Sequence, residues 1–230
     1  MATTNNGDIE LYYETFGNPG DPVLLLVNGL GSQCINFKEE FCEKFAAQGF
    51  LVVRFDNRDV GLSTHLHDGP DYTLADMAND GFAVLDAVGA PAAHIAGWSM
   101  GGMIVQTMAI AQPARVLSLT SVMSSPGGVA LAADPEVAEV FGAKLPRSRD
   151  EAVAQYIDGI NVWGSPAYRE VDRLTRDAEL AYDRSFDPKG RARQSVAVFK
   201  SPSRQDALRS VTLPALVIHG DADRLVPIEA

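Results

Sequence analysis

The sequence predicts an α/β fold in which a mostly parallel sheet is flanked by helices and carries a helical cap insertion. Short apolar runs without polar alternation, such as Val23–Val27, are typical of strands buried on both faces. Amphipathic segments alternate with these runs, which is the rhythm of a parallel sheet with crossover helices. Between residues 124 and 210 this rhythm stops, and helix-like segments follow one another between prolines.

Each predicted element has its own signal in the chain. The strands are expected at residues 9–16, 23–27, 50–55, 93–97, 116–122 and 215–218. A helix is expected over 36–48, where Phe37, Phe41 and Phe45 recur every fourth residue and Gly49 ends the pattern. Thr73 and Asp76 predict a capping box at the start of a second helix that Gly89 ends, and residues 100–111 form a third that Gln112-Pro113 ends.

The chain divides into a core and an insertion. Residues 1–124 are predicted to form the first part of the core domain, 125–190 the helical cap, and 191–230 the second part of the core, incomplete at its C-terminal end. The helix-like segments of the interrupted region are 135–141, 149–157, 168–180 and 191–199. A basic cluster lies at its end (Lys189, Arg191, Arg193, Lys200, Arg204 and Arg209), and its helical spacing favours a solvated face.

Composition limits the class of protein. With 230 residues, 46% of them hydrophobic, and only 2 Cys, the chain is not disordered, collagenous or a disulfide scaffold. A formal net charge of −11 argues against nucleic acid or a membrane surface as partner. Cys34 and Cys42 are too far apart along one helix-like segment to form a disulfide. No signal peptide or membrane span is visible, so a cytoplasmic location is predicted.

The strongest functional signal is Gly97-Trp98-Ser99-Met100-Gly101, which stands between a predicted strand and a predicted helix. In that context the pattern Gly-x-Ser-x-Gly is typical of a sharp turn that projects the serine hydroxyl from the edge of the sheet. Small residues at the two ends let the strand and the helix approach closely. Free N–H groups at the helix N-terminus can stabilise a developing oxyanion. The motif therefore predicts Ser99 as a nucleophile.

Two other loops at strand ends complete the pattern. Asn28-Gly29-Leu30-Gly31 follows a buried strand and can direct the Leu30 N–H to the same point as the Met100 N–H, which predicts an oxyanion hole. A plain turn is the alternative for this loop. Asp223 follows the last predicted strand and is the candidate acid of a catalytic triad, with a turn-forming aspartate as the alternative.

Together with residues 56–63, these elements resemble the α/β-hydrolase family, and within it the branch of bacterial esterases similar to aclacinomycin methylesterase. The resemblance implies the α/β-hydrolase fold with a helical cap. It also implies Ser99 as the nucleophile, Leu30 and Met100 as the oxyanion donors, and Asp223 as the acid.

The resemblance further implies that Asp56 and Arg58 are structural, and their opposite charges independently predict a buried or half-buried ion pair between them. The sequence departs from the family at Asn28, where a histidine usually precedes the first oxyanion glycine. Because the backbone N–H is the working group, this departure affects the pocket more than the mechanism.

A second departure concerns the general base, which in the family is a histidine that follows the acid. The sequence has no histidine after Asp223. His65 and His67 are predicted to be exposed or at the rim of the site and His94 to lie in a strand, while His219 is an alternative base. The chain therefore looks C-terminally truncated before the catalytic histidine, and a missing C-terminal segment or a partner chain is expected to supply it.

These features predict a serine hydrolase that acts on small-molecule carboxylic esters through an acyl-enzyme, with no cofactor and no metal. Alternatives are lactone hydrolysis, perhydrolysis or carbon–carbon bond cleavage on the same triad, and a non-catalytic binding protein on a degraded hydrolase scaffold. Trp98, Met123, Phe141 and Trp163 are predicted to contact the substrate, with plain core packing as the alternative. The sequence predicts neither the particular ester nor the oligomeric state.

Overall fold

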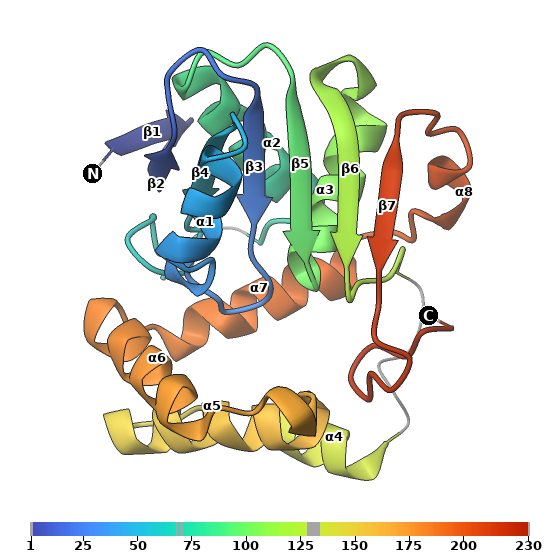
Figure 1. Cartoon of the computed structure of the whole chain (residues 1–230). Helices are drawn as coiled ribbons and strands as arrows, with labels where there is room; N and C mark the ends of the chain where they lie inside the picture. The colour runs from blue at the N-terminus through green and yellow to red at the C-terminus, as the bar shows by residue number, and fades with distance from the viewer. Residues whose placement is uncertain (1, 68, 70, 128–133, 230) are drawn as a thin grey trace.

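A seven-stranded sheet forms the centre of the molecule (Figure 1). The computed structural model describes residues 2–67, 69, 71–127 and 134–229. The strands lie in the order β1-β2-β4-β3-β5-β6-β7. The neighbours from β4 to β7 are parallel, whereas β1 and β2 join antiparallel at one edge. The predicted α/β class with a mostly parallel sheet is confirmed.

The bounds of the elements follow the chain. The strands are β1 (Ala2–Asn6), β2 (Ile9–Phe16), β3 (Val23–Val27), β4 (Leu51–Phe55), β5 (Ala93–Trp98), β6 (Val116–Val122) and β7 (Ala215–Ile218). The α-helices are α1 (Glu39–Ala46), α2 (Leu74–Ala87), α3 (Met100–Ala111), α4 (Pro135–Phe141), α5 (Arg149–Trp163), α6 (Val171–Arg184), α7 (Pro188–Lys200) and α8 (Gln205–Leu208). Short 3-10 turns cover Cys34–Asn36, Pro113–Arg115 and Pro166–Tyr168.

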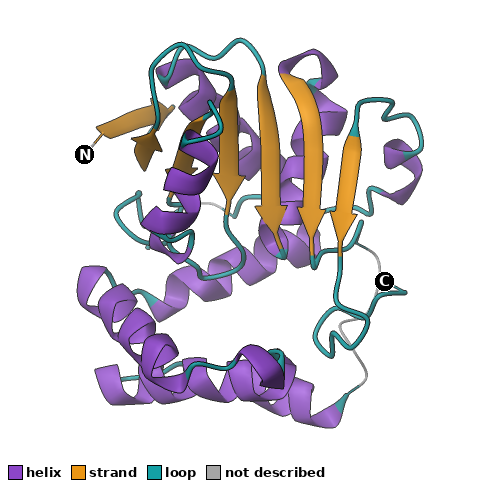
Figure 2. Ribbon diagram, viewed as in Figure 1, coloured by secondary structure: helices purple, strands orange, loops and turns teal. Residues whose placement is uncertain are grey.

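Alternate side chains of the central strands enter two different hydrophobic layers. Leu25 and Val27 of β3 pack in one layer with residues of α2 and α3. Leu24 and Leu26 pack in the other with Phe37 and with residues of α1. Helices therefore cover both sides of the sheet, as Figure 2 shows. Because every side chain of β3 is buried, the strand is an uninterrupted apolar run in the sequence.

The parallel strands all end on the same side of the sheet, and a layer of helices lies opposite those ends (Figure 1). Helix α7 crosses beneath the strand ends. Helices α4, α5 and α6 form a further layer, in which α5 packs against both of the others. Helices α4, α5 and α6 form a roof opposite the loops that follow β3, β5, β6 and β7. Parallel sheets bind ligands at this end of their strands.

The predicted start of α2 is confirmed at Thr73. The Asp76 carboxylate accepts hydrogen bonds from both the backbone N–H and the hydroxyl of Thr73, each at 2.8 Å. We expect Thr73→Ala to lower the free energy of unfolding by about 1 kcal/mol, because the helix loses a capping group. Thr73→Ser keeps the hydroxyl and should stay within about 0.5 kcal/mol of wild type in urea denaturation. Equal losses in both variants would contradict the capping role.

Several elements differ from their predicted bounds. The expected helix over 36–48 is a 3-10 turn followed by α1, because Lys38 adopts an extended conformation (φ −55°, ψ 150°) between them. Helix α5 continues to Trp163 instead of ending at 157. Strand β1 was not predicted, since its sequence Ala-Thr-Thr-Asn-Asn has no apolar run. The domain boundaries remain a prediction: residues 128–133 of the cap lie outside the described residues, and α7 runs through the 190/191 boundary.

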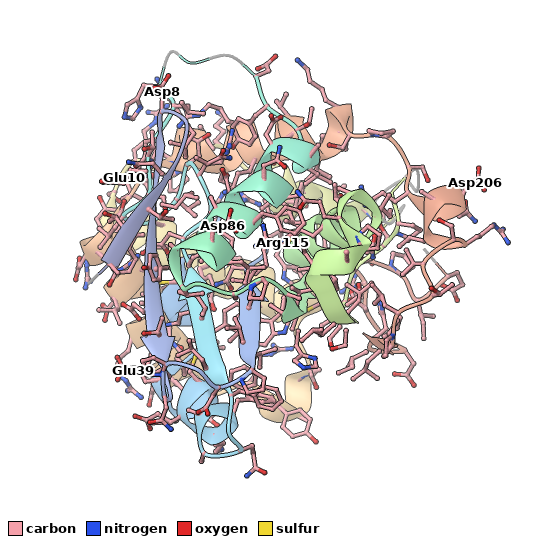
Figure 3. All side chains as sticks on the ribbon, turned by 90° about the horizontal axis from the view of Figure 1, so that it is seen from above. Asp8, Glu10, Glu39, Asp86, Arg115 and Asp206 are labelled. Atoms are coloured by element: carbon pink, nitrogen blue, oxygen red, sulfur yellow. The ribbon has the colours of Figure 1, made fainter. Side chains whose placement is uncertain are left out.

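Acidic side chains stand at the outside of the molecule. Figure 3 shows Asp8, Glu39 and Asp206 at its outer boundary, and all three are exposed. Asp86 of α2 lies 2.6 Å from the guanidinium of Arg115 in an exposed ion pair. Among the described residues, no helix is both long and apolar enough to cross a bilayer.

Candidate active site

Ser99 occupies the sharp turn between β5 and α3. Its backbone has φ 54° and ψ −120°, a region that residues with a side chain rarely adopt. The neighbouring strand fixes this conformation, because the Ser99 N–H donates to Val122 O at 2.9 Å and the Ser124 hydroxyl donates to Ser99 O at 2.7 Å. The predicted strand–turn–helix context of the serine is therefore present.

The glycines around Ser99 are required by close backbone contacts. A Cβ atom on Gly97 would lie 2.1 Å from Gly101 O, and a Cβ atom on Gly101 would lie 2.0 Å from Val27 O. Such distances are far inside van der Waals contact, so no side chain fits at either position. The glycines let β5, α3 and the end of β3 converge, and this convergence puts the loop after β3 beside Ser99.

A cavity of about 1080 Å³ opens between the strand ends and the helical roof. All of the predicted site residues line it: Leu30, Trp98, Ser99, Met100, Met123, Phe141, Trp163 and Asp223. The structure thus brings together segments that are more than a hundred residues apart.

Two residues that line the cavity, Leu30 and Met100, have backbone amides without an acceptor in the described part of the chain. Met100 is the first residue of α3, so its N–H has no partner within the helix. The N–H of Leu30 also makes no hydrogen bond to a described residue. Gly29 brings this loop to Ser99, since a Cβ on Gly29 would lie 3.2 Å from the serine Cβ. Two free donors near one hydroxyl are the arrangement that an oxyanion hole needs.

Side chains that the sequence did not single out hold this loop in place. Gln194 of α7 is fully buried, accepts from the Gly31 N–H at 2.8 Å and donates to Arg58 O at 2.8 Å. Asn57 donates to Asn28 O at 3.1 Å from the loop after β4. A glutamine inside a basic segment carries no local signal of this role, because its partners lie more than a hundred residues away.

Asp223 follows β7 and is held by its own loop. One carboxylate oxygen accepts from the N–H groups of Leu225 and Val226, both at 2.9 Å. The other oxygen lies 3.6 Å from Nε2 of His219, and that nitrogen is 2.7 Å from Val226 O. The carboxylate is therefore both the turn former that was the alternative prediction and a half-buried acceptor with one less-occupied oxygen.

None of the four histidines lines the cavity among the residues that the structure describes. His65 lies with Nδ1 3.0 Å from Asp187 and Nε2 3.0 Å from Gly61 O. His94 is hydrogen-bonded to the Ser118 hydroxyl at 2.7 Å within the sheet. His219 is turned toward its own loop. The geometry gives none of them a direct contact with Ser99.

The residues in left-handed conformations gather at this cavity. Among the described residues, the non-glycine positions with positive φ are Asp59 (70°), Ser99 (54°) and Met123 (42°). Each lines the cavity. Backbone strain of this kind costs on the order of 1–3 kcal/mol per residue and is found preferentially at functional sites.

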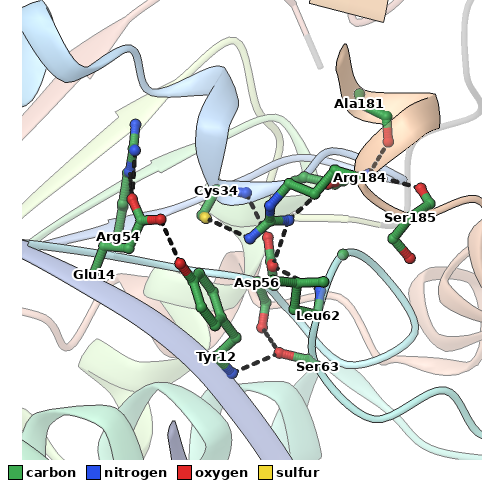
Figure 4. A network of polar contacts seen from close by, with 12 residues as sticks. Tyr12, Glu14, Cys34, Arg54, Asp56, Leu62, Ser63, Ala181, Arg184 and Ser185 are labelled. Carbon is green, nitrogen blue, oxygen red and sulfur yellow. Dashed lines mark hydrogen bonds and ion pairs between the residues drawn. The ribbon is translucent and has the colours of Figure 1, made fainter. Parts of the chain in front are cut away.

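Asp56 and Arg58 do not pair with each other, so that prediction was wrong. Asp56 accepts from the guanidinium of Arg184 at 2.8 Å and from the N–H of Cys34 at 2.6 Å (Figure 4). Arg58 binds Asp80 of α2 instead, with Nε 2.6 Å from the carboxylate. Both residues lie in the loop after β4, where each charge meets a partner from another element, Arg184 of α6 for Asp56 and Asp80 of α2 for Arg58.

The Asp56 contact joins the helical roof to the core. Arg184 is the last residue of α6, and its guanidinium also donates to Gln33 Oε1 at 2.6 Å. The Gln33 amide in turn donates to Ala181 O and Ser185 O. Burial raises the pKa of the Cys34 thiol, so this neighbouring sulfur stays protonated.

A second acidic group joins α7 to the loop after β4. Asp59, His65 and Asp187 place one ligand atom each within 4.8 Å of one another, which is the spacing of a cation site. The guanidinium of Arg193 donates to Asp59 at 2.8 Å and to Asp187 at 2.7 Å. Its positive charge is therefore already shared between the two aspartates. Although burial opposes ionisation of Asp187, hydrogen bonds from His65 and Arg193 lower the pKa of its carboxyl.

The solvated face predicted for the basic cluster at 189–209 holds for Lys189, Lys200 and Arg209, which are exposed, and is wrong for Arg191, Arg193 and Arg204. Arg193 is bound by two aspartates, and Arg204 is buried, with its guanidinium donating to Gln106 Oε1 at 3.1 Å and Ser125 O at 3.2 Å. Arg191 is half-buried and lines the cavity. The spacing of these charges along the sequence is that of a surface helix. It does not show that other parts of the fold cover this side of α7.

The predicted substrate contacts differ in character. Phe141 and Trp163 enter the cavity from the roof, and Met123 is 38% exposed at the end of β6. Trp98 also packs against Phe37, with ring centroids 4.3 Å apart, and contributes to the layer under α1. Trp98 therefore fits the core alternative as well as the predicted one.

Comparisons with known proteins agree with this arrangement. A family model described as the alpha/beta hydrolase fold matches residues 22–155. The rhodomycin D methylesterase of Streptomyces sp. (strain C5) is 34% identical over 181 residues, which cover 75% of this chain and 58% of that protein. The rhodomycin D methylesterase of Streptomyces peucetius is 33% identical over 183 residues, again 58% of its length. The chain thus matches less than two thirds of these relatives.

Among solved structures, an esterase from Rhodococcus sp. ECU1013 superposes with a TM-score of 0.78 and 21% identity, covering 99% of this chain and 82% of that one. At that identity the similarity concerns the fold.

Proposed function

This chain belongs to the alpha/beta hydrolase fold family, and on that premise we propose that it hydrolyses carboxylic esters through a covalent acyl-enzyme formed on Ser99. The strained turn at Ser99 carries the proposal: a positive φ at a serine, held by hydrogen bonds and placed in a large cavity, is expensive unless the hydroxyl must project there. The names of the two methylesterases support a carboxylic ester as the bond that is broken.

The proposed reaction uses groups that line one cavity. The Ser99 hydroxyl attacks the ester carbonyl, and the carbonyl oxygen becomes an oxyanion that accepts from the N–H groups of Leu30 and Met100. Collapse of the tetrahedral intermediate expels the alcohol and leaves the acyl group on Ser99. Water then attacks the acyl-enzyme and releases the acid. Each oxyanion donor contributes about 3 kcal/mol to such a step.

A general base must remove the serine proton, and we propose a histidine outside residues 1–230 for this role. The proposal rests on the position of Asp223, whose less-occupied carboxylate oxygen is available to orient an imidazole. It also rests on the contacts of His65, His94 and His219, whose ring nitrogens engage other partners, and on the position of His67 outside the cavity lining. The base then comes from a further part of the polypeptide or from a partner chain.

A fluorophosphonate probe tests this proposal, because it reacts only with an activated serine. We expect the complete natural polypeptide that contains these residues to be labelled once, and mass spectrometry of the digest to place the adduct on the peptide that contains Ser99. Residues 1–230 alone should be labelled at least ~10³-fold more slowly, since the base is absent.

Either of two outcomes would overturn part of this picture. Equal labelling of residues 1–230 and the complete polypeptide would mean that the base lies within the present sequence. No labelling of the complete polypeptide would favour a non-catalytic binding protein on this scaffold.

A further inference from the structure

Arg191 lines the cavity, and within the described part of the chain its guanidinium has neither an acidic partner nor a hydrogen-bond acceptor. Arg58, Arg184 and Arg193 each contact a buried aspartate. Among the described residues, no side chain or carbonyl accepts a hydrogen bond from the Arg191 guanidinium, whose carbon lies over the Phe141 ring. Burial alone lowers the pKa of this group, with no nearby carboxylate to oppose the shift.

The position of Arg191 places its charge in the cavity. It lies in the first turns of α7, which begins at Pro188 and passes beneath the strand ends (Figure 1). Its aliphatic stem packs on the loop after β3, where a Cβ on Gly31 would lie 3.1 Å from both Cγ and Cδ. Its guanidinium carbon lies 5.1 Å from the ring centre of Phe141, on α4 of the roof.

This geometry holds the guanidinium between the candidate oxyanion loop and the roof. The cation–π contact with Phe141 uses no hydrogen-bond donor of the guanidinium, so its N–H groups remain available to a ligand. The nearby acidic groups are engaged elsewhere: Asp59 and Asp187 bind Arg193, and Asp177 binds Lys38 at 2.7 Å. An arginine stays charged at neutral pH, and a half-buried charge without a partner is costly to the free protein.

We propose that Arg191 binds an ionised carboxylate of the substrate, so that the preferred ester carries a second, free carboxylate. This inference rests on the proposed function and deepens it. The planar guanidinium matches a carboxylate in bidentate geometry. One unpaired guanidinium matches a ligand group with one negative charge, whereas a phosphate monoester carries a charge of about −2. Arg204 does not supply the second positive charge, because protein acceptors already bind its guanidinium.

A binding experiment tests this without depending on turnover. The complete polypeptide carrying Ser99→Ala is titrated by calorimetry with the monomethyl esters of succinate, adipate and suberate, and with their dimethyl esters. We expect at least one monomethyl ester to bind at least ~10-fold more tightly than its dimethyl counterpart. Adding Arg191→Gln should remove that preference, and the dissociation constant of the dimethyl ester should stay within ~2-fold of its value in Ser99→Ala alone. Acetyl esters of hydroxy acids carry the free carboxylate on the alcohol part of the ester. Comparing their affinities with those of the same compounds after methylation of that carboxylate tests the alcohol side.

Control variants separate this role from a structural one. Arg147→Gln removes one charge from an exposed position on the roof and should keep the preference. Arg191→Lys should keep part of it. The melting temperature of Arg191→Gln should equal or exceed that of wild type, because an unpaired buried charge is removed. A lower melting temperature, or a preference that survives Arg191→Gln on both sides of the ester, overturns the proposal.

The two proposals fail in different ways. If a probe never labels Ser99 but the carboxylate preference depends on Arg191, the hydrolase proposal fails and the anion site stands. If Ser99 is labelled and no carboxylate-bearing ester shows a preference, the anion site fails and the hydrolase proposal stands.

Discussion

Replacing Ser99 by alanine is expected to lower kcat/KM for a short p-nitrophenyl ester by at least ~10³-fold in the complete polypeptide. The proposed acyl-enzyme cannot form without the hydroxyl, and the free amides of Leu30 and Met100 then provide only residual catalysis. The melting temperature should stay within about 2 °C of wild type, because alanine keeps the Cβ and the backbone hydrogen bonds at this turn are unchanged. Steady-state kinetics and thermal unfolding measure the two quantities.

Ser203→Ala is the matched control for this variant. Ser203 also lines the cavity, but it is exposed and lies beyond α7 at the start of the segment leading to β7. Its removal should leave kcat/KM within about 3-fold. If Ser99→Ala retains most of the activity, another group is the nucleophile.

The largest expected effect on stability is that of Asp80→Ala in α2. Asp80 is fully buried, and its carboxylate accepts two hydrogen bonds from Arg58, at 2.6 and 2.7 Å, and one from Asn6 at 2.8 Å. Alanine would leave the Arg58 guanidinium buried without its partner, so we expect a loss of about 3–5 kcal/mol in the free energy of unfolding. Urea denaturation of residues 1–230 measures it.

Asp86→Ala provides the comparison on the same helix. Asp86 pairs with Arg115 at 2.6 Å, but its side chain is 66% exposed, so the expected loss is below about 1 kcal/mol. A partial rescue of Asp80→Ala by adding Arg58→Met would confirm that the unpaired charge causes the loss. Similar losses for Asp80→Ala and Asp86→Ala would mean that burial does not decide the cost.

The sequence predicted the elements whose signals are local. Val23–Val27 and Met100–Ala111 match the structure residue for residue, because an apolar run and a glycine or proline boundary lie within a few positions of each other. The capping box at Thr73 is local in the same sense. Strand β1 escaped prediction because its stability comes from pairing with β2 rather than from its own side chains.

The candidate site was predictable where chemistry and backbone geometry share one motif. Ser99 and its flanking glycines are of this kind. Partners across the fold were not predictable: Asp56 binds Arg184, which is 128 positions away, rather than Arg58, two positions away. The basic segment around Arg191 shows the same limit, since helical spacing describes a face but not what covers it.

The left-handed conformations at Asp59, Ser99 and Met123 have a consequence for any attempt to improve this protein by directed evolution. Glycine adopts such conformations at little cost, so replacement of Ser99 or Met123 by glycine is expected to relieve strain, whereas Asp59 is also needed as the partner of Arg193. A library screened only for heat resistance would therefore enrich substitutions at the rim of the cavity. Each round therefore has to select for activity as well, because otherwise variants with higher thermal stability and lower activity will accumulate.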